Sequence, residues 1–420
     1  MKENAQRQIK INKAYSVYCG IVEYNEITHK EMLSAGFKEW IHAIPGNIDF
    51  LNKDDLNKYY YPPFVESMLP TLGSETQCDG GYDCYAEIKR FRKKIKKDYT
   101  LSQNNKEIKF RIEYLDVFTF PENLLVFCFR TTFPDPDADS VSSANYHLRE
   151  YYEVEELKEI KEYLKPIIGT EPEIIGNKLK LFNYIEHEPT DKEMVDNMLY
   201  DIGTCSPIGS AQGLLPDFQP SEVYFDELIR HNSIEIFKTW KALCLFDSFT
   251  VALDKPPHHH EIWEYSYFSL IYVHSLYVKY FLYRLNNKFH KQKKYKIDAL
   301  VKEFNQFDHI YNLNSISHNF LPQKLYDKLR FSLEIEEELQ IMRSNLDIAN
   351  QRAYKKRNIK LNRILSFIAF LTIITTILDG SVYINKVVFE TNINYVLATS
   401  ITSGVIIIFL IRYYKLYVKQ

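Results

Sequence analysis

"FLTIITTILDGSVYIN", residues 370–385, starts as a run that is apolar enough for a membrane and then reaches a carboxylate at Asp379. When residues are placed at 100° intervals around a helix, Thr372, Thr376 and Asp379 fall within about 60° of one another. Lipid disfavours a carboxylate away from the interface, and ionisable groups within membranes usually face water or the interior of a bundle. The stretch therefore predicts a membrane helix with one polar side.

Two interpretations of this polar side remain open. In the first, the hydroxyls bond back to carbonyls of their own helix and Asp379 caps its end. In the second, the side lines water, and several copies of the chain must contribute it because two helices cannot enclose a channel. A ring of Asp379 carboxylates at the outer mouth then attracts cations, and an apolar ring near the inner mouth gates the pore. The predicted pore residues are Leu365, Ile368, Thr372, Thr376 and Asp379.

Two runs near the end of the chain, residues 364–378 and 395–411, carry no charge. With their neighbours they approach the ~20 residues that a spanning helix needs. We therefore expect transmembrane helices over 361–379 and 395–412, joined by a short outer loop. A buried helical hairpin in a soluble domain is the alternative, but two uncharged runs of this length disfavour it.

The charges that flank these runs predict the topology. Lysines and arginines precede the first run at 352–363 and follow the second at 412–419, whereas the connecting loop holds only Lys386 among basic residues. Basic flanks remain on the cytoplasmic side of a membrane. The N-terminus lacks the apolar core of a signal peptide. We expect a multi-pass protein of the inner (plasma) membrane, with both termini and the large domain in the cytoplasm.

Composition narrows the functional class. A net charge of −3 argues against direct nucleic-acid contacts, and six scattered cysteines are typical of reduced thiols. Three candidate metal motifs each lack a complete ligand pattern. They are the Cys78 and Cys84 pair, the His258–His260 run and the acidic segment 133–140. No Ser/His/Asp or Cys/His arrangement stands out, so we expect neither a metal site nor an enzyme.

The chain divides into three predicted domains. They are a cytosolic α/β ligand-sensing domain over 1–255, a long helical stalk region over 256–360, and the two membrane helices over 361–415. Neither Pro nor Gly occurs between Pro322 and Gly380, so one helix is predicted from about residue 321 into the membrane. The apolar stretch 265–283 contains Lys279 and tyrosines along its whole length, which favours a buried helix over a third span.

Residues before 256 mix strand and helix patterns, so the fold class is α+β (or α/β), followed by long helices and a C-terminal two-helix hairpin. β-branched and aromatic runs separated by turn residues predict strands, and apolar residues at helical spacing predict helices. Strands are expected at 15–24, 109–120, 123–133 and 179–187, a hairpin at 238–253, and helices at 149–165 and 191–202.

The segment 205–221 is a long stretch rich in Gly, Ser and Pro, and long ordered loops are often functional. Its two inner glycines allow the backbone to approach a phosphate, and its aspartate accepts from a ribose or an amine. Two arginines upstream are candidate phosphate partners. No P-loop lysine follows, so a surface linker is the alternative. The predicted ligand-binding residues are Arg130, Arg149, Gly209, Gly213 and Asp217.

The order of these segments resembles the CorA family of cation channels, best over 258–415. The family's Gly-Met-Asn motif after the first span is missing, and Asp379-Gly380-Ser381 stands in that region. The layout is most similar to the CorA-like effectors associated with type III CRISPR systems. This resemblance implies a homo-oligomeric (pentameric) channel in a lipid bilayer, gated in antiviral defence by a nucleotide second messenger, adenylated S-adenosylmethionine. A constitutive transporter of Mg²⁺ and other divalent cations is the runner-up. A membrane-anchored enzyme or binding module, whose spans serve only as anchors, is the third hypothesis.

Overall fold

The computed structural model describes residues 9–24, 29–39, 56–68, 89–103, 106–169, 172–255, 261–291, 297–388 and 403–404. The chain groups into two compact units, Met1–Met342 and Arg343–Gln420. We call the first the sheet unit and the second the C-terminal unit. The sheet unit includes the helices between residues 263 and 332 as well as the sheet itself, so these helices share one compact body with the strands.

Within the described residues, nine strands form one mixed sheet in the order β2-β3-β4-β5-β1-β6-β9-β8-β7. Neighbouring strands are antiparallel except for the parallel pair β6 and β9. The strands are β1 (Ile11–Glu23), β2 (Lys38–Glu39), β3 (Lys89–Gln103), β4 (Lys106–Phe120), β5 (Leu124–Thr132), β6 (Lys180–His187), β7 (Ser233–Ile234), β8 (Trp240–Cys244) and β9 (Ser248–Leu253).

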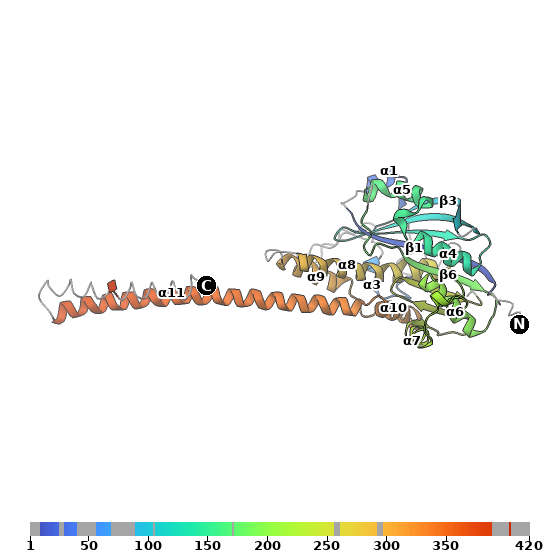
Figure 1. Ribbon diagram of the computed structural model, residues 1–420. Coiled ribbons are helices and arrows are strands. Elements are labelled where there is room, and N and C mark those ends of the chain that lie inside the picture. Colours follow the sequence, from blue (N-terminus) through green and yellow to red (C-terminus); the bar gives the residue numbers. More distant parts are fainter. Residues whose placement is uncertain are drawn as a thin grey trace. The chain divides into compact units, whose positions relative to one another are not determined.

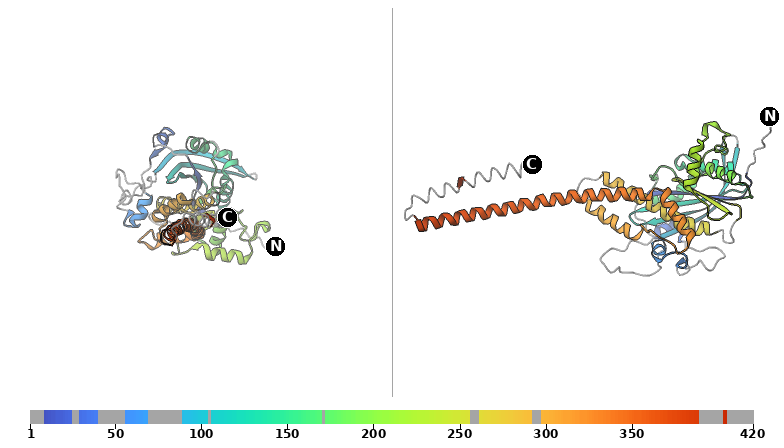
Figure 2. Two further views of the ribbon diagram at one scale, coloured as in Figure 1. Left: turned by 90° about the vertical axis from the view of Figure 1, so that its left-hand side faces the viewer. Right: turned by 90° about the horizontal axis from the view of Figure 1, so that it is seen from below.

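Helices cover both faces of the sheet: α4 and α5 lie on one side and α8 on the other (Figure 1), and the end-on view of Figure 2 shows the same layering. The helical elements are α1 (His29–Ser34), α3 (Pro62–Met68), α4 (Ala138–Leu148), η2 (Tyr151–Glu153), η3 (Glu155–Leu157), α5 (Lys158–Ile168), α6 (Lys192–Thr204), η4 (Pro216–Phe218), α7 (Glu222–Asn232), η5 (Trp263–Tyr272), α8 (Val273–Lys291), α9 (Ile297–Ile310), α10 (Phe320–Ser332) and α11 (Ile335–Val388).

The mixed α+β class and both predicted hairpins are confirmed. β4 and β5 pair through a turn at Glu122 and Asn123, whose φ angles of 61° and 59° match the twist of a tight hairpin. β8 and β9 form the second hairpin, at 238–253. The predicted strands at 15–24 and 179–187 correspond to β1 and β6. The predicted helices at 149–165 and 191–202 correspond to η2 through α5 and to α6.

The central strand β1 is buried on both faces, and the faces differ in chemistry. Tyr18 points toward α4, where its hydroxyl donates to Asn145 Oδ1 at 2.8 Å beside the main apolar core. Tyr15 points the other way and stacks on Tyr184. Successive side chains of a strand alternate between faces, so β1 separates an apolar layer from a layer that contains buried charges.

Gly20 of β1 lies directly opposite Phe127 of β5, and the phenyl ring occupies the space that a Cβ at Gly20 would fill. We expect Gly20→Ala to lower the free energy of unfolding by about 1–3 kcal/mol, because overpacking forces the ring or the backbone to move. Urea denaturation followed by tryptophan fluorescence measures this change. In a Phe127→Leu background the smaller side chain leaves room, so the cost of Gly20→Ala should shrink; an equal cost there would contradict the explanation.

The apolar stretch 265–283 is a buried helix of the sheet unit, as predicted. Its first part, η5, is a π-helix of 10 residues, a rare conformation that is frequent at functional sites. Tyr272 at its end donates a hydrogen bond to the backbone oxygen of Leu181 at 2.9 Å. Phe120 and Tyr277 stack with ring centroids 4.2 Å apart. These contacts attach the helix to the sheet.

Two predictions for the C-terminal helices are wrong. The single helix expected from residue 321 is interrupted: α10 ends at Ser332, Glu334 adopts a left-handed φ of 54°, and α11 begins at Ile335. The first span was also expected to end near residue 379, yet α11 continues through Gly380 to Val388. The second predicted span lies outside the described residues, apart from residues 403–404.

Candidate functional site

α11 is the one helix among the described residues whose length and composition suit a membrane crossing. An 18-residue window of it has a mean hydropathy of 1.9, and only 6% of that window is buried. Seven large apolar side chains are exposed along this part of the helix. They are Ile364, Leu365, Phe367, Ile368, Leu371, Ile373 and Leu378. Exposed apolar surface of this extent indicates contact with lipid or with another protein surface.

The threonine hydroxyls of α11 bond back to their own helix. Thr372 Oγ1 donates to the oxygen of Ile368 at 3.0 Å, and Thr376 Oγ1 donates to the oxygen of Thr372 at 2.8 Å. This is the arrangement that the first interpretation of the polar side predicted, in which the hydroxyls bond back to carbonyls of their own helix. Because each hydroxyl uses its proton internally, its lone pairs remain as acceptors on the helix surface. Such a row of oxygens suits water or cations.

A shallow groove of about 440 Å³ runs along α11, and we call it the α11 groove. It is lined by Ala369, Thr372, Ile373, Thr376 and Ile377. Of the five predicted pore residues, Thr372 and Thr376 therefore line the groove. Leu365 and Ile368 are exposed but do not line it. Asp379 is exposed within α11 and does not cap the helix, which continues for nine more residues.

Arg130, a predicted phosphate ligand, is instead part of the buried layer beneath η5. Its guanidinium pairs with Glu264 of η5 at 2.7 Å and lies over the ring of Tyr15, 4.3 Å from the centroid. Tyr114 donates to the same carboxylate at 2.7 Å, and burial, with the charge of Glu264, raises the pKa of Tyr114 well above its usual value. Arg130 is thus a structural partner of the π-helix.

Two more arginines and one more carboxylate complete this buried cluster, which the sequence interpretation missed. Asp116 is fully buried and accepts from Arg92 Nε at 2.6 Å and from Arg90 Nη2 at 3.2 Å. Burial lowers the pKa of Arg90 to about 10, although Asp116 opposes that shift. Arg90 and Arg92 alternate along β3 and so share a face. The two-residue spacing of Arg90 and Arg92 was the sequence signal that could have placed both side chains on one face of a strand.

The remaining predicted ligand residues do not meet in one site. Arg149 follows α4 and lies beside Cys205. Burial raises the pKa of the Cys205 thiol, and the positive charge of Arg149 opposes this shift. Gly209 has φ 94° and donates its amide to Asp201 at 2.7 Å, and Gly213 has φ 74°. Asp217 is exposed in η4. A cavity of about 230 Å³ is lined by Gly209, but Arg130, Arg149, Gly213 and Asp217 do not line it.

Asp201 of α6 accepts hydrogen bonds from the backbone of the loop 205–221. Its carboxylate accepts from the amides of Gly209 and Ala211, and it is buried. Burial raises the pKa of Asp201 to about 6, while these amides oppose the shift. The loop 205–221 is therefore ordered by an aspartate of α6, and its glycines allow the turns that bring the amides to that carboxylate.

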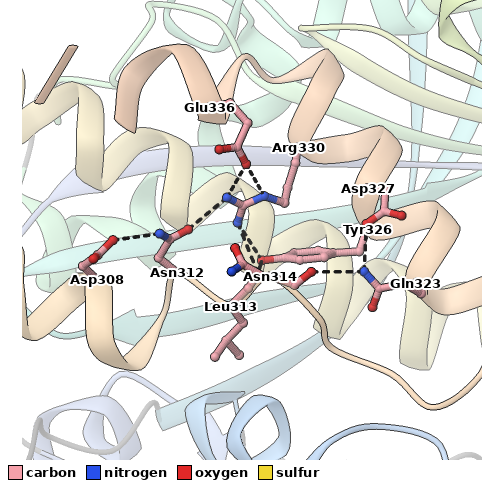
Figure 3. A network of polar contacts seen from close by, with 9 residues as sticks. All are labelled: Asp308, Asn312, Leu313, Asn314, Gln323, Tyr326, Asp327, Arg330 and Glu336. Atoms are coloured by element: carbon pink, nitrogen blue, oxygen red, sulfur yellow. Dashed lines mark hydrogen bonds and ion pairs between the residues drawn. The ribbon is translucent and has the colours of Figure 1, made fainter. Parts of the chain in front are cut away.

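A polar network holds the corner between α10 and α11 (Figure 3). Arg330 of α10 donates from Nε to Glu336 of α11 at 2.8 Å and from Nη2 to Asn312 Oδ1 at 2.9 Å. It also donates to the Tyr326 hydroxyl at 3.0 Å. The buried ring of His274 lies nearby, and burial, reinforced by Arg330, lowers its pKa to about 3. Arg330 is therefore a central donor at this corner.

Glu338, one turn into α11, is held by α8. Lys279 Nζ lies 3.2 Å from Glu338 Oε1, and Asn286 Nδ2 donates to Glu338 Oε2 at 2.7 Å. Lys279 is almost fully buried, so these bonds are shielded from water. We call them the Glu338 contacts. Through them, the helix that lies on the sheet is bonded directly to the first turns of α11.

No group of three or more His, Cys, Asp or Glu side chains in the described part of the chain can hold a metal ion. Cys78, Cys84 and His258–His260 lie outside the described residues. Comparison with family models, curated proteins and solved structures finds no match to this chain.

Proposed function

We propose that the protein is a homo-oligomeric membrane cation channel whose opening is controlled by a ligand of the sheet unit. One observation carries the proposal: an exposed apolar window of α11 contains a groove with a row of hydroxyl oxygens that have lone pairs free to accept. Apolar surface favours insertion, and oxygen acceptors favour cations over anions.

Self-association follows from the number of spans. One or two helices cannot surround a water-filled path, so the α11 grooves of several copies would have to face a common axis. Turning the polar groove toward that common axis removes it from lipid, where unsatisfied polar groups are costly. Five copies and a role in type III CRISPR defence are proposals that rest on the resemblance to CorA-like effectors. Placing both termini and the sheet unit in the cytoplasm is a proposal that rests on the basic residues flanking the two apolar runs.

Control by the sheet unit is supported by the contacts at the start of α11. The Arg330 network and the Glu338 contacts hold the first turns of a helix that continues without a break to Val388. A ligand that shifts α8 would change these contacts and hence the position of α11. The predicted ligand residues do not form one site. The proposal of adenylated S-adenosylmethionine as the ligand therefore rests on the resemblance alone.

Cation flux from liposomes tests the channel proposal. The purified full chain should release a cation load when ligand is added, and its oligomers should persist in detergent. A chain with the span 361–379 replaced by an unrelated apolar helix is the matched control, and it should insert without flux. Equal flux from both chains, or none from a well-folded oligomer with ligand, overturns the proposal and leaves an anchored binding module.

Asp379→Asn is expected to lower single-channel cation conductance by roughly two- to fivefold, because an acidic ring concentrates cations at a pore mouth. The carboxylate is exposed on α11, so oligomer formation should not change. Planar-bilayer recording at low and high salt measures the effect, which should shrink at high salt as charges are screened. Unchanged conductance at low salt would remove Asp379 from the pore.

A further inference from the structure

The cavity of about 230 Å³ in the sheet unit is lined by α6, by the start of α4 and by the loop 205–221. Four residues of α6 face it, and their spacing of three or four places them on one side of the helix. They are Met194, Asn197, Met198 and Asp201. The volume is below the ~300 Å³ at which pockets for drug-sized ligands begin, so the cavity suits a small molecule.

Asn197 brings a buried amide to this cavity without a hydrogen bond. The residue is only 7% exposed, and none of the described residues forms a hydrogen bond with its side chain. Buried polar side chains almost always have a partner, and this one lines a cavity in which a ligand could supply it. Leaving such a group unpaired is costly, so a ligand that pairs with it is favoured.

Asp201, one turn further along α6, offers additional acceptor capacity. Its two carboxylate oxygens each accept one backbone amide, from Gly209 at 2.7 Å and from Ala211 at 3.0 Å. A carboxylate oxygen has a second lone pair, so both oxygens can accept again. Burial raises the pKa of Asp201 to about 6, and the group is therefore still largely ionised at neutral pH.

The charge that faces the cavity is negative. Asp137 and Asp139 have half-exposed side chains and share one lysine, Lys106, whose Nζ lies 3.2 Å and 2.8 Å from them. No lysine, arginine or histidine is among the described residues that line the cavity. One nearby cation thus opposes three carboxylates when Asp201 is ionised.

Neither an anion nor a metal ion suits this lining. The positive end of α4 would attract an anion, but Asp137 caps that helix and Asp139 lies in its first turn. The Gly209 amide, which the sequence offered to a phosphate, donates to Asp201 instead. Within the described residues, these carboxylates do not form a group that could hold a metal ion. The ligand that matches the charge is an organic cation.

The rest of the lining is apolar, and it defines the body of that cation. Six apolar side chains face the cavity, and two of them are methionines, which adapt to ligands of different shape and contact aromatic rings favourably. They are Ile9, Ala138, Met194, Met198, Ile208 and Leu214.

We propose that the cavity binds a small primary amine with an apolar body, whose ammonium group donates to the Asp201 carboxylate and to the side-chain oxygen of Asn197. An ammonium group has three donors and no acceptor, and a carboxylate only accepts, so the two are complementary. The apolar body then packs against Met194 and Met198. Binding here needs neither a pore nor an oligomer, so the inference goes beyond the proposed channel function.

Isothermal titration of the full chain in detergent, with detergent alone as the blank, tests binding with benzylamine, benzyl alcohol and benzoate. The three probes share one ring and nearly one size but differ in charge. Benzylamine is expected to bind in the millimolar range. Benzyl alcohol and benzoate should bind about tenfold more weakly or less, because only the ammonium group forms a charge-assisted hydrogen bond with Asp201.

Asn197→Ala is the primary variant, because this amide has no hydrogen bond to lose in the free protein and alanine favours a helix. It should weaken benzylamine binding about fivefold and leave the thermal-unfolding midpoint nearly unchanged. Asp201→Asn is the second variant and should weaken binding about tenfold or more through loss of the charge. Glu193→Gln removes an exposed carboxylate of α6 that does not line the cavity, and this matched control should bind benzylamine like the unchanged chain.

No binding of benzylamine at millimolar concentrations overturns the site, as does an affinity that both cavity variants leave unchanged. A loss that Glu193→Gln shares overturns it as well. Equal affinity for benzylamine and benzyl alcohol, or tighter binding of benzoate, overturns the assignment of a cation. Displacement of benzylamine by equimolar Mg²⁺ overturns the assignment of an organic one. Amine binding that depends on Asn197 in a chain without flux sustains the site and counts only against the channel.

Discussion

Asp116→Ala should destabilise the sheet unit by about 3–5 kcal/mol, because it leaves two buried arginines without their shared carboxylate. Asp116 is fully buried and pairs with Arg92 at 2.6 Å and with Arg90 at 3.2 Å. Burial already lowers the pKa of Arg90, and losing Asp116 removes the charge that opposes this shift. The midpoint of urea unfolding measures the effect, and Trp263 on the same side of the sheet reports it by fluorescence.

The same strand pair supplies a matched control. Arg111 Nε and Asp98 Oδ1 lie 2.7 Å apart across β3 and β4, with the same bidentate geometry but exposed to solvent. Exposed pairs contribute little because water screens them. Asp98→Ala should therefore leave the unfolding midpoint nearly unchanged. If both substitutions had the same effect, burial would not be what makes the Asp116 cluster important.

Local sequence patterns predicted the hairpins because the strand-forming runs and the turn residues that join them lie within a short segment of the chain. The first arm of the 109–133 hairpin starts with alternating polar and apolar residues and the second arm starts with an apolar run. The chain turns at Pro121, Glu122 and Asn123, and β4 and β5 pair as expected. β3 escaped prediction because KRFRKKIKK looks like a solvated charged segment. Its arginines are buried only because Asp116 and Glu264 come from other parts of the chain. The pairing of these arginines with carboxylates from distant segments is not local, so the sequence shows it only weakly, in the spacing of Arg90 and Arg92.

The helix boundaries failed for a related reason. Without Gly or Pro near residue 334, the sequence predicted a continuous helix, but Glu334 takes a left-handed conformation and the Arg330 network holds the corner. Conversely, Gly380 suggested a helix end, yet α11 passes through it. A glycine costs a helix only about 1 kcal/mol, which tertiary or membrane surroundings easily outweigh.

For the candidate sites, periodicity was informative and residue type alone was not. Helical spacing identified Thr372 and Thr376, which do line the α11 groove. Arg130 was chosen because arginine binds phosphate, but it has a buried carboxylate partner in η5. Arg284, which directly follows the apolar stretch 265–283, drew no notice, yet its buried guanidinium donates to Glu303 Oε1 at 3.0 Å. Glu303 belongs to α9, so no local pattern encodes this contact.

The double substitution Thr372→Val and Thr376→Val should reduce ligand-dependent cation flux about tenfold or more, because each valine keeps the side-chain shape and removes an oxygen acceptor from the path. The lost hydroxyls donate only to carbonyls of α11 itself, so the helix should persist. Apolar pore linings favour dewetting, and every copy in an oligomer would carry the change. Stopped-flow flux from liposomes, normalised to inserted protein, measures the effect.

Thr375→Val is the control that separates a pore from a membrane anchor. Thr375 also donates its hydroxyl back to the oxygen of Thr372, at 2.8 Å, but it does not line the α11 groove. It therefore matches the test residues in chemistry and differs in position. Full flux with Thr375→Val and reduced flux with the double variant would place water along the groove. Equal flux in all three chains would mean that the groove faces lipid or protein, and α11 would then be an anchor.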